Sequence, residues 1–209
     1  SIGNFATHSF HETKNITCGE GGALFVRDKD FIERSEIIFE KGTNRSKFIN
    51  GQVDKYSWVD KGSSYILSDL LASLLYAQLD NFTEIQNKRK TLWNNYYESL
   101  NEWSIKKNIQ LPYVPHYCEQ TYHMFYMILP NNKKRNDLIE HLNHNDITAT
   151  FHYLPLDSSK MGVKIKHNDQ RECPVSKRAS DCIIRLPLYF DLSDKEQEKV
   201  IQSVISFEL

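Results

Sequence analysis

The chain has 209 residues, of which 40% are hydrophobic and 25% charged, so it can form one large domain or two small ones around a sizeable core. Its 26 basic and 27 acidic residues give a formal net charge of -1, which excludes a broad basic face for nucleic acid or anionic lipid. No long apolar run is present, and the first residues have no basic-then-apolar leader pattern. We therefore expect a cytoplasmic protein with no membrane and no nucleic-acid partner.

The first part of the chain predicts one short strand and one helix. Gly19, Gly21 and Gly22 open a turn, and the apolar run 23–26 that follows is typical of a buried strand. Asp28 or Asp30 can then cap a helix that ends at Gly42. Its inner face is expected to hold Phe31, Ile32, Ser35, Ile38 and Phe39.

Residues 41–64 form a long stretch rich in Gly, Asn, Ser and aromatic side chains. Loops of this length in compact domains are usually functional or disordered, and the aromatic residues argue for order. Ser68 and Asp69 then start an apolar helix, and its leucine stripe between 70 and 79 predicts core or dimer interface. A second helix follows, with Phe82, Ile85, Leu92 and Tyr96 on one face.

Strands and helices alternate in the rest of the chain. The pattern predicts strands at 122–129, 147–152 and 185–188, with a helix around Leu138 after the first of them. Ser193 and Glu196 have the spacing of a capping box that opens a last helix. This alternation indicates a small α/β domain.

Neither the cysteines nor the histidines have the spacing of a metal site. The cysteines are Cys18, Cys118, Cys173 and Cys182, and we expect reduced thiols because a chain of this size needs no disulfide framework. The histidine pairs are His8 with His11 and His141 with His144. Neither pair has a third ligand nearby in the sequence, so no metal is predicted.

The segment from Ser9 to Ala23 carries the residues with chemical potential. A lysine that bonds covalently to a cofactor needs a partly desolvated position, which favours its free amine. A glycine-rich turn that leads into a buried strand would hold Lys14 on a firm backbone, and the Ser9 hydroxyl offers a donor for a phosphate. Glycines also let the chain approach a planar cofactor closely. These residues alone leave open that Lys14 is a surface lysine before a turn.

Residues 9–22, S-F-H-x-x-K-N-x-x-x-G-E-G-G, resemble the cofactor-lysine signature of the DegT/StrS-type PLP-dependent sugar aminotransferase family. The similarity continues through 41–65, 151–156 and 185–193, and it extends to the branch that makes dTDP-4-amino-4,6-dideoxygalactose for enterobacterial common antigen. The resemblance implies an α/β fold of the fold-type-I PLP transferases. Residues 1–80 would be the C-terminal part of the large PLP-binding domain, and 81–209 the small C-terminal domain.

The resemblance also implies roles for individual residues. Pyridoxal 5'-phosphate would be the cofactor, with Lys14 as the catalytic residue that holds it and moves a proton. Ser9 would bind the cofactor phosphate, and His11 would line the pocket. Ser64 stands where the wider family has an Asn that reaches the partner subunit's phosphate, so this contact is expected in a weaker form.

Substrate contacts are expected from three further residues. Arg45 suits the diphosphate of a nucleotide sugar, although a solvated basic loop would also explain it. His152 and Tyr153 follow a predicted strand and face either the active site or the core. The family usually has a His at Asp157, and residues 158–168 also depart from the family pattern, which leaves the sugar open.

The activity that the resemblance implies is transfer of an amino group from glutamate to C4 of a dTDP-4-keto-6-deoxy-hexose by a homodimer. In this family the acid that pairs with the pyridine nitrogen lies before the lysine segment, so we expect an incomplete chain with little activity alone. Two alternatives stay open. One is a PLP- or PMP-dependent keto-sugar dehydratase, against which Lys14 argues because those relatives have His there. The other is a non-catalytic remnant or regulatory relative.

Overall fold

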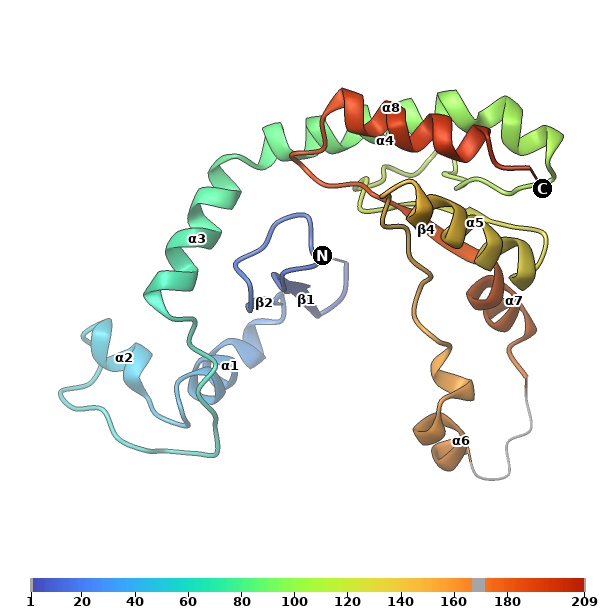
Figure 1. Ribbon diagram of the computed structural model, residues 1–209. Helices are drawn as coiled ribbons and strands as arrows, with labels where there is room; N and C mark the ends of the chain where they lie inside the picture. The colour runs from blue at the N-terminus through green and yellow to red at the C-terminus, as the bar shows by residue number, and fades with distance from the viewer. Residues whose placement is uncertain (1, 167–171, 209) are drawn as a thin grey trace. The chain divides into compact units, whose positions relative to one another are not determined.

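The computed structural model describes residues 2–166 and 172–208. The chain forms two compact units, residues 1–83 and 84–209, and each is described by itself (Figure 1). In the part of the chain that the structure describes, no helix combines the length and the apolar character that crossing a membrane requires.

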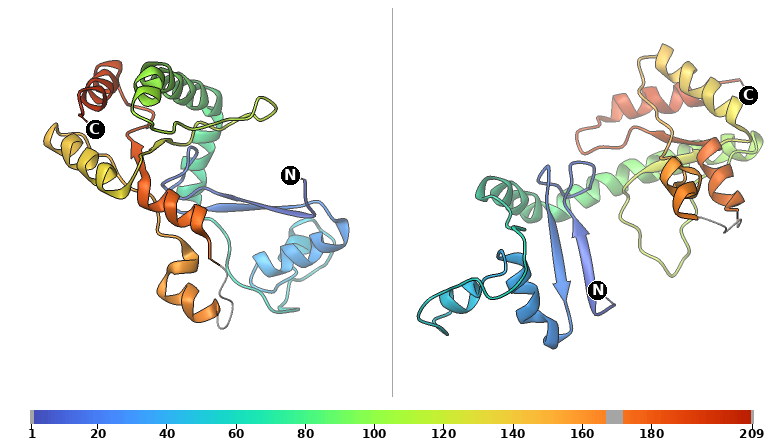
Figure 2. Two further views of the ribbon diagram at one scale, coloured as in Figure 1. Left: turned by 90° about the vertical axis from the view of Figure 1, so that its right-hand side faces the viewer. Right: turned by 90° about the horizontal axis from the view of Figure 1, so that it is seen from below.

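The first unit is built on a β-hairpin followed by helices. Strands β1 (Phe5–Ser9) and β2 (Gly22–Val26) pair antiparallel, with Phe5 opposite Val26 and Ser9 opposite Gly22. The two strands lie side by side in Figure 2. The elements that follow are η1 (Lys29–Phe31), α1 (Ile32–Phe39), α2 (Arg45–Ile49) and α3 (Asp69–Asp80).

The local signals of this unit are confirmed. The Asp28 side chain accepts from the N–H of Asp30 at 3.1 Å, although the turn that it opens is a 3-10 turn and α1 begins only at Ile32. The Ser68 hydroxyl caps α3 by accepting from the N–H of Leu71 at 3.4 Å. The long stretch 41–64 is ordered and contains α2.

The predicted burial of these elements is wrong. Strand β2 exposes about half of Leu24 (54%) and Phe25 (49%), and neither α1 nor α3 contains a buried residue. An amphipathic strand or helix buries its apolar face only where a second layer packs on it, and a two-stranded hairpin with short helices provides none. The leucine stripe of α3 is therefore not part of a core here, and its role as a dimer interface stays a prediction.

The second unit packs helices onto a small sheet. Its strands β3 (Phe125–Ile128) and β4 (Ile183–Leu186) pair antiparallel, and isolated bridges from Gln110 and Thr150 extend the sheet at both edges. Helices α4 (Phe82–Lys106) and α8 (Asp194–Ile205) run side by side in Figure 1. The remaining elements are α5 (Asn132–His144), η2 (Leu156–Ser158), α6 (Lys160–Lys166) and α7 (Pro174–Cys182).

An aromatic cluster forms the centre of the core of the second unit. The ring centroid of Phe125 lies 5.5 Å from that of Trp93 and 5.2 Å from that of Tyr96. The polar atoms of these large side chains are satisfied, because Tyr96 Oη donates to the carbonyl of Pro187 at 2.8 Å and Trp93 Nε1 to that of Met124 at 3.2 Å. Burial raises the pKa of Tyr96, so its hydroxyl remains a donor.

Two of the three predicted strands are confirmed, and the third is not. The segment 147–152 forms only one bridge, between Thr150 and Arg185. Its side chains still alternate between buried and exposed, since Ile147 and Ala149 are buried and Thr148 between them is exposed. The next hydrogen-bonded position would place Pro187 opposite Thr148, and proline has no N–H to donate to a ladder.

The predicted capping box at the start of α8 is confirmed. Glu196 Oε2 accepts from the Ser193 N–H at 2.9 Å and from the Ser193 hydroxyl at 2.6 Å. The Ser193 hydroxyl in turn accepts from the N–H of Glu196 at 3.3 Å. These hydrogen bonds favour the ionised carboxylate, and they hold the pKa of Glu196 below its usual range.

This capping box predicts an acid-dependent loss of stability. Because the folded pKa of Glu196 is depressed, its contribution is fully present above the unfolded carboxyl pKa of about 4.3 and is lost as the pH falls through the folded pKa. The melting temperature of the wild type should exceed that of Glu196→Gln at pH 6, and this difference should shrink below about pH 4. Glu208→Gln, an exposed position beyond α8, is the control. A difference independent of pH would contradict the assignment.

Candidate functional site

Lys14 lies in the loop that joins β1 to β2. The hairpin continues beyond its strands, since the Phe10 N–H donates to the Gly21 carbonyl at 2.8 Å and the Glu12 N–H to the Gly19 carbonyl at 2.7 Å. A tight turn follows, in which the Lys14 N–H donates to the carbonyl of His11 at 2.9 Å. The backbone on both sides of Lys14 is therefore held by hydrogen bonds.

The glycines of this loop make room for the loop itself. Gly19 adopts a φ of +87°, which favours glycine at the turn. A Cβ on Gly21 would lie 2.5 Å from Cys18 Sγ and 3.4 Å from Leu67 Cδ1. Cys18 is fully buried, and its thiol donates to the carbonyl of Glu20 at 3.4 Å. The predicted reason for Gly21, close approach to a cofactor, is replaced by close packing of Cys18.

The Lys14 side chain is exposed, whereas a partly desolvated position was expected. Other residues of the same loop are covered, since Ile16 and Cys18 are buried, but Lys14 is not. Among residues 2–166 and 172–208, Lys14 forms no salt bridge. Its amine is thus available for chemistry on a backbone that is fixed.

His11 lies in the same loop as Lys14, and Ser9 is the last residue of β1, directly before this loop. Ser9 Oγ accepts from the His11 N–H at 3.4 Å, so its own proton remains available to a ligand. The imidazole of His11 lies between Thr13 Oγ1, 3.2 Å from Nδ1, and Glu20 Oε1, 3.5 Å from Nε2. A hydroxyl donor and an unpaired amine in one hairpin are the donor set that an aldehyde and phosphate cofactor such as pyridoxal phosphate requires.

Arg45 and Ser64 meet at a third residue, Glu40. Arg45 Nη1 lies 3.0 Å from Glu40 Oε1, and the backbone of Ser64 forms a bridge with that of Glu40. The predicted phosphate-binding arginine thus has an internal carboxylate partner. The Arg45 side chain is 47% exposed and that of Glu40 only 12%, so the arginine is open to solvent while its carboxylate partner is largely covered.

His152 and Tyr153 belong to the second unit, and their rings lie 5.0 Å apart. Tyr153 is 75% exposed, and His152 Nδ1 is buried without a hydrogen-bond partner. The two residues are therefore not a satisfied core pair. Burial, and then the charge of Arg185, lower the pKa of His152 below its ordinary value, so the imidazole is neutral at pH 7.

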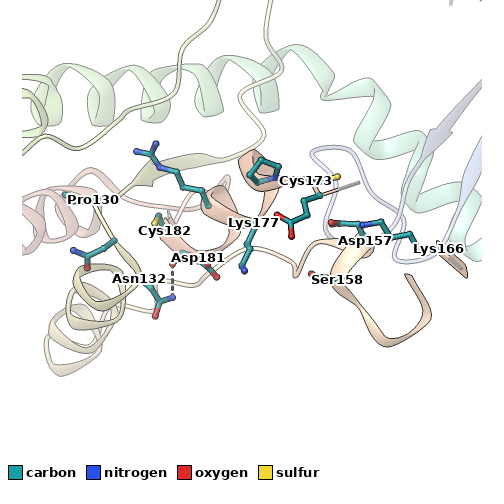
Figure 3. Close-up of a pocket in the computed structure, with 13 residues that line it drawn as sticks. Pro130, Asn132, Asp157, Ser158, Lys166, Cys173, Lys177, Asp181 and Cys182 are labelled. Carbon is teal, nitrogen blue, oxygen red and sulfur yellow. Dashed lines mark hydrogen bonds between the residues drawn. The ribbon is translucent and has the colours of Figure 1, made fainter. Parts of the chain in front are cut away.

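The second unit also contains an open cavity of about 690 Å³, shown in Figure 3. It is lined by residues of α5, α7 and η2, and it includes Asp157, the position where the sequence departs from the family pattern. Asn132 Nδ2 donates to the Asp181 carbonyl at its edge, at 2.9 Å. Residues 167–168 of the divergent segment 158–168 lie outside the described residues. None of the site residues predicted above lines this cavity.

The four cysteines are free thiols, and the described part of the chain contains no metal site. Cys18 and Cys182 are buried free thiols, and Cys118 and Cys173 are exposed ones. No group of three or more His, Cys, Asp or Glu side chains in residues 2–166 and 172–208 is placed to hold a metal ion.

The sequence did not single out Arg185, although its pattern contains a signal. Arg185 is the one charged residue of the apolar strand β4, Ile183–Leu186. A charge inside a short apolar strand marks either a solvent-facing position or a binding group. Its neighbours are Thr150 and His152, since Arg185 Nη2 donates to Thr150 Oγ1 at 3.1 Å.

Comparison with known proteins gives a family and a fold. Residues 1–205 match the family model of the DegT/DnrJ/EryC1/StrS aminotransferase family. The protein MJ1066 of Methanocaldococcus jannaschii is 24% identical over 214 residues, which cover 98% of this chain and 54% of that protein. The chain thus spans about half the length of the curated relative that it matches.

Solved structures agree with this comparison. The putative sugar aminotransferase Spr1654 of Streptococcus pneumoniae, in its apo form, is 25% identical with a TM-score of 0.79, covering 99% of this chain and 52% of that chain. It is also known in PLP and PMP forms. The aminotransferase TlmJ of Streptoalloteichus hindustanus has 23% identity and a TM-score of 0.82, covering 99% of this chain and 52% of that chain, which shows the shared α/β fold.

Proposed function

This chain belongs to the DegT/DnrJ/EryC1/StrS aminotransferase family, and on that premise we propose that its protein transfers an amino group to a nucleotide-linked keto-sugar, with pyridoxal 5'-phosphate as cofactor. The observation that carries the proposal is the Lys14 loop. Its amine forms no salt bridge among the described residues, and it stands on a backbone fixed by hydrogen bonds. The solved structures that the chain resembles include a putative sugar aminotransferase.

Four residues are proposed to hold the cofactor. Lys14 Nζ forms the covalent bond, the Ser9 hydroxyl donates to the phosphate, and His11 lines the pocket. Ser64 contributes a further hydroxyl toward a phosphate in the partner subunit. When bound, pyridoxal phosphate supplies an electron sink for breaking bonds at the amino-bearing carbon.

The chain's own residues then position groups and move protons. Lys14 Nζ would take the proton from the carbon that bears the donor's amino group and deliver it to C4′ of the cofactor, and in the second half of the reaction it would move a proton in the opposite direction, from C4′ to the sugar carbon that receives the nitrogen. Arg45 binds the diphosphate of the sugar nucleotide after exchange from Glu40. Substrate contacts are also proposed for His152 and Tyr153, whose rings lie 5.0 Å apart.

The proposed substrates are glutamate as donor and C4 of a dTDP-4-keto-6-deoxy-hexose as acceptor. The support is the similarity of residues 41–65, 151–156 and 185–193 to dTDP-4-amino-4,6-dideoxygalactose transaminase. We place the protein in the cytoplasm as a homodimer that serves cell-surface polysaccharide synthesis, such as enterobacterial common antigen. Residues 1–80 are assigned to the large domain and 81–209 to the small one.

An assay on the complete product of the gene tests this proposal. The protein is incubated with pyridoxal phosphate, ¹⁵N-glutamate and dTDP-4-keto-6-deoxyglucose, and the sugar product is analysed by mass spectrometry. We expect 2-oxoglutarate and one ¹⁵N-labelled amino sugar in equal amounts. Loss of water from the sugar without nitrogen transfer would instead support the dehydratase, and turnover of a different sugar only would overturn the acceptor.

A further inference from the structure

The sheet of the second unit has an apolar face and a polar face. Tyr126 lies opposite Arg185 in the β3–β4 register, and Arg185 lies opposite Thr150 across the bridge. Directly opposed residues share a face, so these three side chains do. His152 follows Thr150 by two residues, so the alternation of an extended segment predicts its side chain on the same face, and burial followed by the charge of Arg185 lowers its pKa. The alternate residues are in the core, namely Phe125, Met127, Ala149, Ile184 and Leu186.

This polar face holds two nitrogen groups whose hydrogen bonding is incomplete. Arg185 Nη2 donates to Thr150 Oγ1, but Arg185 Nε is buried without a partner. The same holds for His152 Nδ1. Arg185 also has no carboxylate in salt-bridge contact within residues 2–166 and 172–208.

The unpaired donors of Arg185 and His152 are the two that a ligand on the polar face would satisfy. A buried donor without a partner is unfavourable, so a group that accepts hydrogen bonds from both residues would bind favourably. An oxyanion matches this need, because a guanidinium donates to paired oxygens in a planar fork and a neutral imidazole offers one more N–H.

We propose that Arg185 and His152 form an oxyanion-binding pair that takes a carboxylate or phosphate group of a substrate, with Thr150 holding the guanidinium in place. The identity of the oxyanion rests on the proposed function, which offers the carboxylates of the amino donor and the diphosphate of the sugar nucleotide. The pair itself depends only on the sheet of the second unit.

Histidine NMR on the full chain tests this pair without any cofactor. The chain is labelled at its histidine rings, and the His152 signal is assigned by its loss in His152→Gln. Inorganic phosphate, dTDP, glutarate and uncharged thymidine are then titrated at constant ionic strength. We expect a saturable shift of the His152 signal with an oxyanion and none with thymidine. Tighter binding of dTDP identifies the phosphate source, and tighter binding of glutarate the carboxylate source.

Three variants make the test specific. Arg185→Gln should weaken oxyanion binding at least tenfold, and Thr150→Val should weaken it less while the charge is kept, which covers the case that the first variant misfolds. Arg178 is an exposed arginine that lines the cavity of Figure 3, and Arg178→Gln should bind the oxyanions as the wild type does. The proposal would be overturned if no oxyanion changed the chemical shift of the His152 signal, or if the change were the same in Arg185→Gln. Lys14→Ala should retain this binding, so failure of amino transfer and failure of the pair are distinguishable.

Discussion

Replacing Lys14 with alanine should reduce amino transfer by the complete gene product roughly 10²- to 10⁴-fold, the usual contribution of a residue that moves a proton. The variant also loses the amine that bonds the cofactor, so the effect should lie at the upper end or beyond. Folding should be unaffected. The side chain is exposed and forms no salt bridge within the described residues, and such substitutions change stability by about 0.5 kcal/mol or less.

The measurement is the initial rate of labelled amino-sugar formation, with the melting temperature followed in parallel. Lys55→Ala removes another exposed lysine of the first unit and is the matched control. Comparable rates for the two variants would contradict the role of Lys14. A Lys14→Ala variant that is inactive and also unfolded would indicate a structural role instead.

Replacing Arg89 with methionine should lower the free energy of unfolding by roughly 3 kcal/mol. Arg89 is only 8% exposed on α4, and its guanidinium donates to three backbone carbonyls, those of Tyr122, His123 and Leu188. Burial lowers the pKa of Arg89 to about 10, which still leaves it charged at neutral pH. Methionine replaces the unbranched apolar stem of arginine but leaves these acceptors without their donor, at about 1–3 kcal/mol each before relaxation.

Denaturant unfolding, followed by circular dichroism, measures this effect. Lys90→Met is the control, because it makes the same type of substitution at the next, exposed position of α4. We expect a clear shift of the midpoint for Arg89→Met and almost none for Lys90→Met. A loss below about 1 kcal/mol for Arg89→Met would mean that water replaces the guanidinium at these carbonyls.

Local signals in the sequence were sufficient for the starts of α3 and α8 but not for the bounds of α1, which runs from Ile32 to Phe39 rather than to Gly42. Ser68 caps α3 and Ser193 with Glu196 caps α8, because both motifs act over three residues of the same segment. The glycine turn before β2 was predicted as well, but β1 was not, so the hairpin that carries Lys14 was missed. The exposure of Leu24 and of the leucines in α3 could not be predicted. An apolar pattern shows which face another element would cover, but it does not show whether that element is present.

Long-range polar contacts were the least predictable part of the molecule. Arg89 is joined to Leu188, 99 residues away, and nothing near it in the sequence marks it as buried. The proposed role of Arg185 could not be predicted for the same reason. It depends on Thr150 and His152, which lie 35 and 33 residues earlier in the chain. Pro187 prevents further pairing between β4 and the 147–152 segment because it has no N–H to donate. This effect could not be predicted without knowing that the two segments are neighbours in the sheet.

The most direct test of the central claim is the site of covalent cofactor attachment. The complete gene product is incubated with pyridoxal phosphate, reduced with borohydride, digested and mapped by mass spectrometry, with Lys14→Ala treated in parallel. Our account predicts one dominant adduct on Lys14 that is absent from the variant. Adducts spread over other lysines, in the same pattern in the wild type and in Lys14→Ala, would contradict it.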